Sequence, residues 1–249
     1  MAVRDGLKPL AELIEPDIRN TFFVRFDSKT GRQRPTTLED HYAAIERYSM
    51  SDTVPDDIAT QYDVARNLYV YAWFEYRFFN VAEANVLTVL ELAMKERIGE
   101  VEIKRYIKQR NKEHLEKTGK KGSTRQGMKT LMEYCRDFRL VRNEGFTQWQ
   151  SHATQQAYYK IRAGHHEWAK AEMKRTGTNE VELPEIAIES LQPDPNYDHV
   201  QHLIDHTNKF RNHYAHGSTT LHNQVLGNFE MVSEFINQLY SPTQSSKAE

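Results

Sequence analysis

Residues 81–98 read VAEANVLTVLELAMKERI, and this stretch decides the fold class. Its apolar residues cover more than half of a helical circumference, which is typical of a central helix packed on several sides. Glu91 and Lys95 stand four residues apart and can pair on the part that stays exposed. Neither proline nor glycine occurs from residue 56 to residue 98. Because this run exceeds an ordinary globular helix, we expect a break near 78–80. The stretch predicts an all-α protein.

Helical spacing continues through most of the chain that follows. We expect helices over 101–116, from Met128 until Gly145, over 151–175, over 200–214 and over 221–239. The irregular residues 176–197 hold three prolines and interrupt this series. Ser218, Thr219 and Thr220 are candidate N-caps between the last two helices. A link this short predicts that the last two helices are antiparallel neighbours.

The N-terminal residues have a different character. Residues 22–26 alternate weakly and indicate a short strand, and residues 27–31 read as a turn. Thr37 with Asp40 resembles a capping box, which predicts a helix through Tyr48. The chain therefore divides into an N-terminal segment of unassigned role (1–52), a helical domain (53–240) and a frayed tail (241–249).

The composition narrows the protein class. The 249 residues suffice for one large domain or two small ones, and the low glycine and proline counts argue against a loop-rich β fold. The single cysteine, Cys135, excludes an internal disulfide and indicates a reducing compartment. The N-terminus has no apolar segment typical of a signal peptide, and no apolar run is long enough for a membrane span. We expect a cytoplasmic protein that does not associate with membranes.

Charge is strongly segregated, although the formal net charge is only −2. Residues 101–142 carry 13 basic and 5 acidic groups, whereas residues 178–205 carry 7 acidic groups and no basic ones. A basic block of this density can attract polyanions. It can equally be the solvated face of a helical hairpin.

A set of chemically suited residues ends the penultimate predicted helix. Arg211 and Asn212 precede His216, and on a helix Asn212 and His216 share one face. Gly217 allows the last turn to unwind, so that imidazole and guanidinium can converge. Arginine matches a phosphate, histidine can move a proton near neutral pH, and asparagine can hold one tautomer. These are the parts for metal-independent transesterification of an RNA phosphodiester.

A structural explanation of the same residues stays open. Arg211 points within 20° of Ile204 on a helix, which is the side that faces the core. It could therefore be a buried cation paired with a carboxylate, and His216 could be a C-terminal helix cap. The candidate partners are Glu75, Glu83 and Glu91.

The segment Arg211, Asn212 and His216, with four residues between Arg and His, resembles the motif of the HEPN superfamily. Its position at the end of the penultimate helix, with one amphipathic helix after it, is similar as well. The resemblance implies an antiparallel helical bundle and a cofactor-free endoribonuclease that dimerises through the motif face. It also implies a role as a toxin or antiviral-defence effector, with an antitoxin or defence protein as partner. Segments at about 100–125 and 145–197 are insertions relative to a minimal bundle.

Further residues are candidates for holding RNA. A histidine stripe follows the helix over 199–213, on the face opposite its apolar residues, and could face phosphate, respond to pH or only be solvated. Its HxxxH spacing is a weak zinc signal, and we predict no metal site. In 158–175 aromatic residues alternate with cations, a pattern that suits single-stranded RNA or docking on the core. The candidate substrate-binding residues are Lys209, His213, Tyr214, Lys120, Lys121, Arg125, Lys160 and Arg162.

Two other functions compete with RNA cleavage. The first is a catalytically silent HEPN-like module that binds RNA or a nucleotide, or acts as a scaffold. The second is an interaction protein that binds a basic partner through the acidic residues 178–205.

Overall fold

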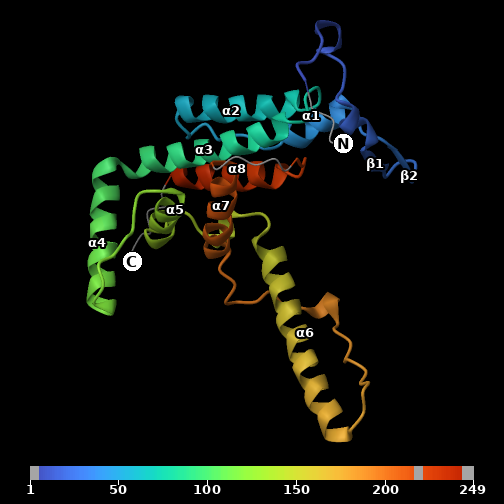
Figure 1. Ribbon diagram of the computed structural model, residues 1–249, viewed down its shortest axis with the longest axis vertical. Helices are drawn as coiled ribbons and strands as arrows, with labels where there is room; N and C mark the ends of the chain where they lie inside the picture. The colour runs from blue at the N-terminus through green and yellow to red at the C-terminus, as the bar shows by residue number, and fades with distance from the viewer. Residues whose placement is uncertain (1–5, 216–220, 243–249) are drawn as a thin grey trace.

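The computed structural model describes residues 6–215 and 221–242, and side chains only outside 208–215. Within these residues the protein is an all-α fold with a short mixed N-terminal region (Figure 1). The helices are α1 (Leu38–Glu46), α2 (Asp56–Tyr71), α3 (Phe78–Ile98), α4 (Glu100–Thr118), α5 (Met128–Asp137), α6 (Trp149–Thr176), α7 (His199–Ala215) and α8 (Leu226–Tyr240).

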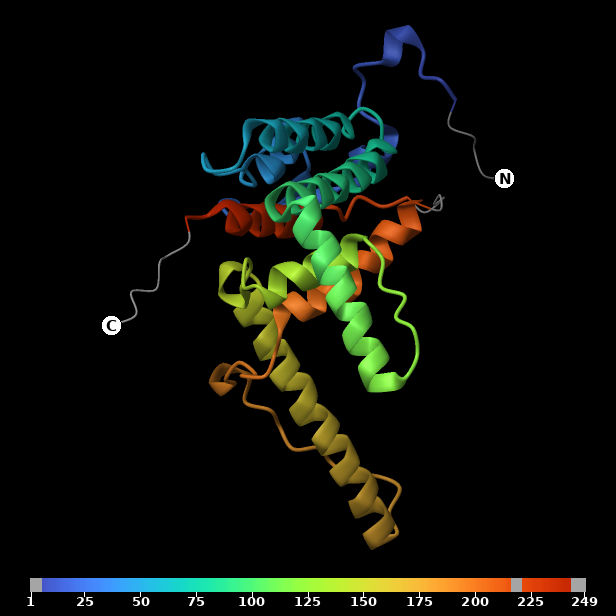
Figure 2. The ribbon, with the colours of Figure 1, turned by 90° about the vertical axis from the view of Figure 1, so that its left-hand side faces the viewer.

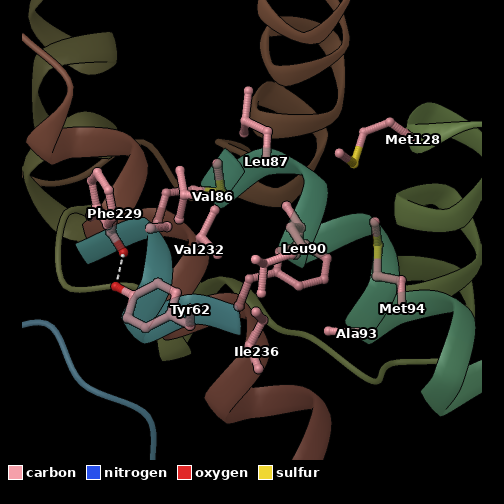
Figure 3. Close-up of a cluster of buried hydrophobic side chains, with 14 of the residues drawn as sticks. Tyr62, Val86, Leu87, Leu90, Ala93, Met94, Met128, Phe229, Val232 and Ile236 are labelled. Atoms are coloured by element: carbon pink, nitrogen blue, oxygen red, sulfur yellow. Dashed lines mark hydrogen bonds between the residues drawn. The ribbon is translucent and has the colours of Figure 1, made fainter. Parts of the chain in front are cut away.

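Helix α3 is the centre of the core, as its apolar sequence predicted. It packs between α2 and α8 and also contacts α5 and α7 (Figures 1 and 2). Val86 and Leu90 are fully buried against Val232 of α8 (Figure 3). The Tyr62 hydroxyl of α2 donates a hydrogen bond to the Phe229 carbonyl at 3.1 Å, which satisfies a buried polar group.

One local prediction in this region is confirmed, and two helix boundaries differ from those expected. The Glu91 carboxylate pairs with the Lys95 ammonium at 2.7 Å. The long glycine-free run does break, but the break spans residues 72–77, a few residues before the expected position. Helix α5 ends at Asp137 rather than continuing to Gly145, because Arg139 adopts a left-handed backbone conformation with φ of 55°.

The predicted antiparallel pairing of the last two helices is wrong. The backbone of α7 packs mainly against α5, and α8 packs along α3. Figures 1 and 2 show α7 crossing α8 instead of running beside it. Leu221 and Val225 precede α8, which begins at Leu226, so the connection is also longer than expected. The candidate caps Ser218, Thr219 and Thr220 lie outside the described residues.

The N-terminal region forms a small hairpin against α1. Strand β1 (Val24–Asp27) pairs in antiparallel register with β2 (Arg32–Pro35), a strand that the sequence did not indicate. The capping box of Thr37 and Asp40 is confirmed, and the Asp40 carboxylate also pairs with Arg34 at 2.5 Å. Asp40 thus joins the hairpin to α1.

Helix α6 projects from the bundle, and the acidic connection returns alongside it (Figures 1 and 2). The return is fixed near its end, where the Asp194 amide donates to the Ala153 carbonyl at 3.0 Å. No helix in the described part of the chain combines the length and the apolar character that crossing a bilayer requires.

Candidate functional site

The predicted catalytic motif lies at the C-terminal end of α7. The backbone of Arg211 and Asn212 is helical, as expected. Their side chains, those of Lys209, His213 and Tyr214, and the whole of His216 lie outside the described residues. The described groups with chemical potential lie along the rest of α7 and beside the segment that follows it.

A buried carboxylate lies next to the segment that links α7 to α8. Glu83 of α3 is only 1% exposed, and most of its neighbours on that helix are apolar. The Asn228 side-chain amide donates to it, and His222 Nε2 lies 3.3 Å from its Oε2. A carboxylate in this position fixes the orientation of the imidazole. The His222 side chain is about one-third exposed, so it can be reached from solvent.

A groove extends from Asn228 between α6, α7 and α8. Its volume is about 240 Å³, and it is lined by His152 from α6 and by His199, His202 and His206 from α7. The opposite wall includes Glu230 of α8, whose carboxylate accepts a hydrogen bond from the Gln148 amide at 2.6 Å. The groove thus brings histidines from two helices together beside the N-terminal half of α8.

The histidines form a continuous series of ring contacts. The centroids of His202 and His206 are 4.0 Å apart and their rings stack, while His152 lies 5.3 Å from His199. Burial, reinforced by His152 and His202, lowers the pKa of His199 to about 4. Burial and then His206 lower the pKa of His202. His199 and His202 are consequently uncharged at neutral pH and become cationic only in acid.

This arrangement corrects the predicted histidine stripe. His199 does not lie on the face opposite the apolar residues, because it is 3% exposed and packs against Phe146 at 5.1 Å. His202 and His206 do reach the surface. Among the described residues, no group of three or more His, Cys, Asp or Glu has the geometry to hold a metal ion.

The other candidate RNA-binding residues are dispersed. Lys120, Lys121 and Arg125 are exposed in the loop after α4, and the Thr124 amide donates to Asn111 Oδ1 at 2.9 Å to fix that loop. Arg162 is exposed on α6. The Lys160 ammonium pairs with the Asp194 carboxylate at 2.5 Å, so a phosphate would have to replace that carboxylate.

Sequence reasoning missed three groups of this site: His152, His222 and Asn228. Their segments are far apart in the chain, and none has a distinctive spacing. Glu83 had one signal, because a carboxylate within a helix that is apolar on most sides needs a buried partner. It was considered only as a partner for Arg211.

Comparison with protein-family models, with curated proteins and with solved structures finds no match to this chain. Any functional assignment therefore depends on the residues and their arrangement.

Proposed function

We propose that this protein is a metal-independent endoribonuclease whose catalytic residues are Arg211, Asn212 and His216. The observation that carries the proposal is the motif itself: Arg211, Asn212 and His216 have the spacing of the HEPN motif, and the backbone of Arg211 and Asn212 belongs to the last turns of α7 in an all-α fold. A further amphipathic helix, α8, follows, as the resemblance requires.

In the proposed reaction, His216 removes the proton from a ribose 2′-hydroxyl, and the resulting oxygen attacks the adjacent phosphorus. Arg211 stabilises the negative charge that grows on the phosphorane, and Asn212 orients the imidazole. The P–O5′ bond then breaks, and the leaving 5′ oxygen takes a proton from the imidazolium. The products are a 2′,3′-cyclic phosphate and a 5′-hydroxyl, so atoms and charge balance without a metal ion.

The surroundings of the motif support this chemistry. Buried Glu83 of α3 and partly exposed His222 form a carboxylate–imidazole pair beside the segment that follows α7. The exposed cations Lys120, Lys121, Arg125 and Arg162 can hold RNA phosphates. A homodimer that joins two motif faces would bring two Arg211 and two His216 into one cleft. We include toxin or antiviral-defence activity, with an antitoxin or defence partner, in the proposal.

Incubation with total RNA in EDTA tests the proposal, with the cut ends mapped by sequencing. Arg211→Ala and His216→Ala should each lower the cleavage rate by about 10²-fold or more while the far-UV CD spectrum stays unchanged. His114→Ala, which removes an exposed imidazole from α4, is the matched control and should cleave normally. Cleavage that needs a divalent metal, or that survives in His216→Ala, would contradict the mechanism.

A catalytically silent RNA-binding module is the second candidate. Buried Glu83 favours it, because its carboxylate already holds Asn228 and lies beside His222, which is a structural arrangement next to the segment that follows α7. In that case the wild-type protein binds RNA without cutting it, and Arg211→Ala unfolds at a lower temperature than wild type.

A further inference from the structure

Three arginines meet in a pocket at the opposite end of α8 from the motif. Arg97 comes from the end of α3, and Arg139 and Arg142 come from the segment after α5. The pocket has a volume of about 200 Å³ and is completed by the last turn of α8 and residues 241–242. A water molecule takes about 30 Å³, so this space can hold a small anion with several waters.

The three guanidinium groups carry no carboxylate partner within the part of the chain that the structure describes. Other arginines in the same residues, such as Arg34 and Arg110, are ion-paired. Glu144 and Asp198 line the adjacent hollow, which Arg139 and Arg142 also border, but none of the acidic residues that the structure describes lines this pocket. Like charges gathered without a counterion repel one another, and a bound anion would relieve that repulsion.

The backbone holds two of these arginines in place. Arg139 has a φ of 55°, and its amide and that of Leu140 donate to the Arg136 and Cys135 carbonyls at 3.0 and 2.8 Å. This is the position after a helix where glycine is usual, because other residues incur a steric penalty there. The Arg142 amide donates to Gln238 Oε1 at 2.9 Å. Strained backbone that keeps a particular side chain in a pocket indicates a functional role for that side chain.

Capping of α8 explains only one of the three. Arg97 Nε donates to the Leu239 carbonyl at 2.7 Å in the last turn of α8, which is a favourable place for a cation. That bond fixes the guanidinium and leaves its terminal nitrogens available. It gives no reason for Arg139 or Arg142 to border the same pocket.

We propose that Arg97, Arg139 and Arg142 form a phosphate-binding site for a nucleotide, either free or within single-stranded RNA. Guanidinium groups match phosphate oxygens with two parallel hydrogen bonds, which favours phosphate over a spherical anion. Phe138 precedes Arg139, is 56% exposed, and stacks on Tyr134 with centroids 4.3 Å apart. An exposed aromatic ring beside arginines is a surface on which a base can stack. The site does not depend on the proposed cleavage activity.

The test uses the full-length protein and a fluorescent 12-nucleotide 2′-O-methyl RNA. This probe lacks a free 2′-hydroxyl, so binding is measured whether or not the protein cleaves RNA. The double variant Arg139→Gly/Arg142→Gln should bind at least tenfold more weakly in fluorescence anisotropy. Its slope of log affinity against log salt should also fall, by about 0.7 for each phosphate that an arginine no longer neutralises. Arg25→Gln, which removes an ion-paired arginine from strand β1, is the matched control and should stay within twofold.

Thermal shift with adenosine monophosphate and with inorganic sulfate identifies the source of the phosphate. Stabilisation of the wild type by the mononucleotide, absent in the double variant, assigns the site to free nucleotides. If the double variant weakens binding of the RNA probe and the mononucleotide does not stabilise the wild type, the site is assigned to phosphates within single-stranded RNA. Phe138→Ala should weaken binding of the RNA probe and of adenosine monophosphate, and it should leave the thermal shift with sulfate unchanged. The Arg139→Gly change alone should not lower the melting temperature, which separates weaker binding from unfolding. Equal affinity and equal salt slope in wild type and double variant, with no arginine-dependent stabilisation by either small anion, would overturn the proposal.

Discussion

Acid should destabilise the fold through His199, and the effect can be isolated by substitution. The pKa of this imidazole is lowered to about 4 in the folded protein, against about 6.5 in an unfolded chain. The unfolded state therefore takes up the proton first as the pH falls. The stabilising contribution of neutral His199 is complete above pH 6.5 and is lost progressively between pH 6.5 and about pH 4.

The magnitude follows from the shift. Each pH unit within this window is worth about 1.4 kcal/mol, so lowering the pH from 6.5 to 5 should cost about 2 kcal/mol from His199 alone. For a chain of this length that corresponds to a fall in melting temperature of roughly 4–8 °C. His199 is nearly inaccessible and packs against Phe146 and His152, so solvent screens this penalty little.

Urea denaturation of wild type, His199→Phe and His199→Gln at pH 7.5, 6.5 and 5 measures this contribution. Other titrating groups, including buried His41, act in all three proteins and cancel in the comparison. The pH dependence should be about 2 kcal/mol smaller in both variants between pH 6.5 and 5. His166→Gln, an exposed position on α6, should retain the wild-type dependence. Parallel stability curves for wild type and the His199 variants would refute the reasoning.

Three further predictions concern packing and reactivity. Gly145→Ala should lower the free energy of unfolding by about 1–3 kcal/mol, because the new Cβ would lie 2.1 Å from Gln238 Cδ. Gly164→Ala, where α6 has open space for a methyl group, should raise the free energy of unfolding by about 0.5–1 kcal/mol. Chemical denaturation checks both variants. Glu83→Ala should lower the free energy of unfolding by about 3 kcal/mol, since it leaves partly buried Asn228 without its acceptor. Glu91→Ala, which loses a more exposed pair, should cost under about 1 kcal/mol in the same assay. Cys135 should resist iodoacetamide at pH 8 in the folded protein and react in urea, as followed by intact mass, because burial raises the pKa of its thiol to about 12; rapid alkylation under native conditions would contradict that environment.

Helical periodicity determined most of the fold from sequence. The apolar residues of 81–98 predicted a central helix because only burial on several sides accounts for them, and α3 has that place. The capping box at Thr37 was readable because its two hydrogen bonds join residues three apart. Such local patterns give the existence of helices and some of their ends. They do not give the neighbours of a helix, and α7 was consequently assigned to the wrong one.

The site was less accessible to sequence reasoning because its groups come together only through tertiary packing. His152 meets His199 across 47 positions of sequence, and Glu83 meets His222 across 139. The stripe of histidines in 199–213 was visible from spacing. Its orientation depended on where α6 and α8 pack, which spacing does not encode.

The sequence indicated that Gly145 ends the helix that begins at Met128, and the structure places the left-handed residue at Arg139 instead. The apolar pattern from Met128 predicted a helix that glycine at 145 would end, because glycine tolerates left-handed backbone at helix ends. The helix instead ends at Asp137, and Arg139, two residues later, adopts the left-handed conformation, while Gly145 is needed for its lack of a side chain against Gln238. Glycine at this left-handed position would make the end of α5 more stable. The arginine is explained if its side chain has a task that glycine cannot perform, and the pocket that it shares with Arg97 and Arg142 supplies one.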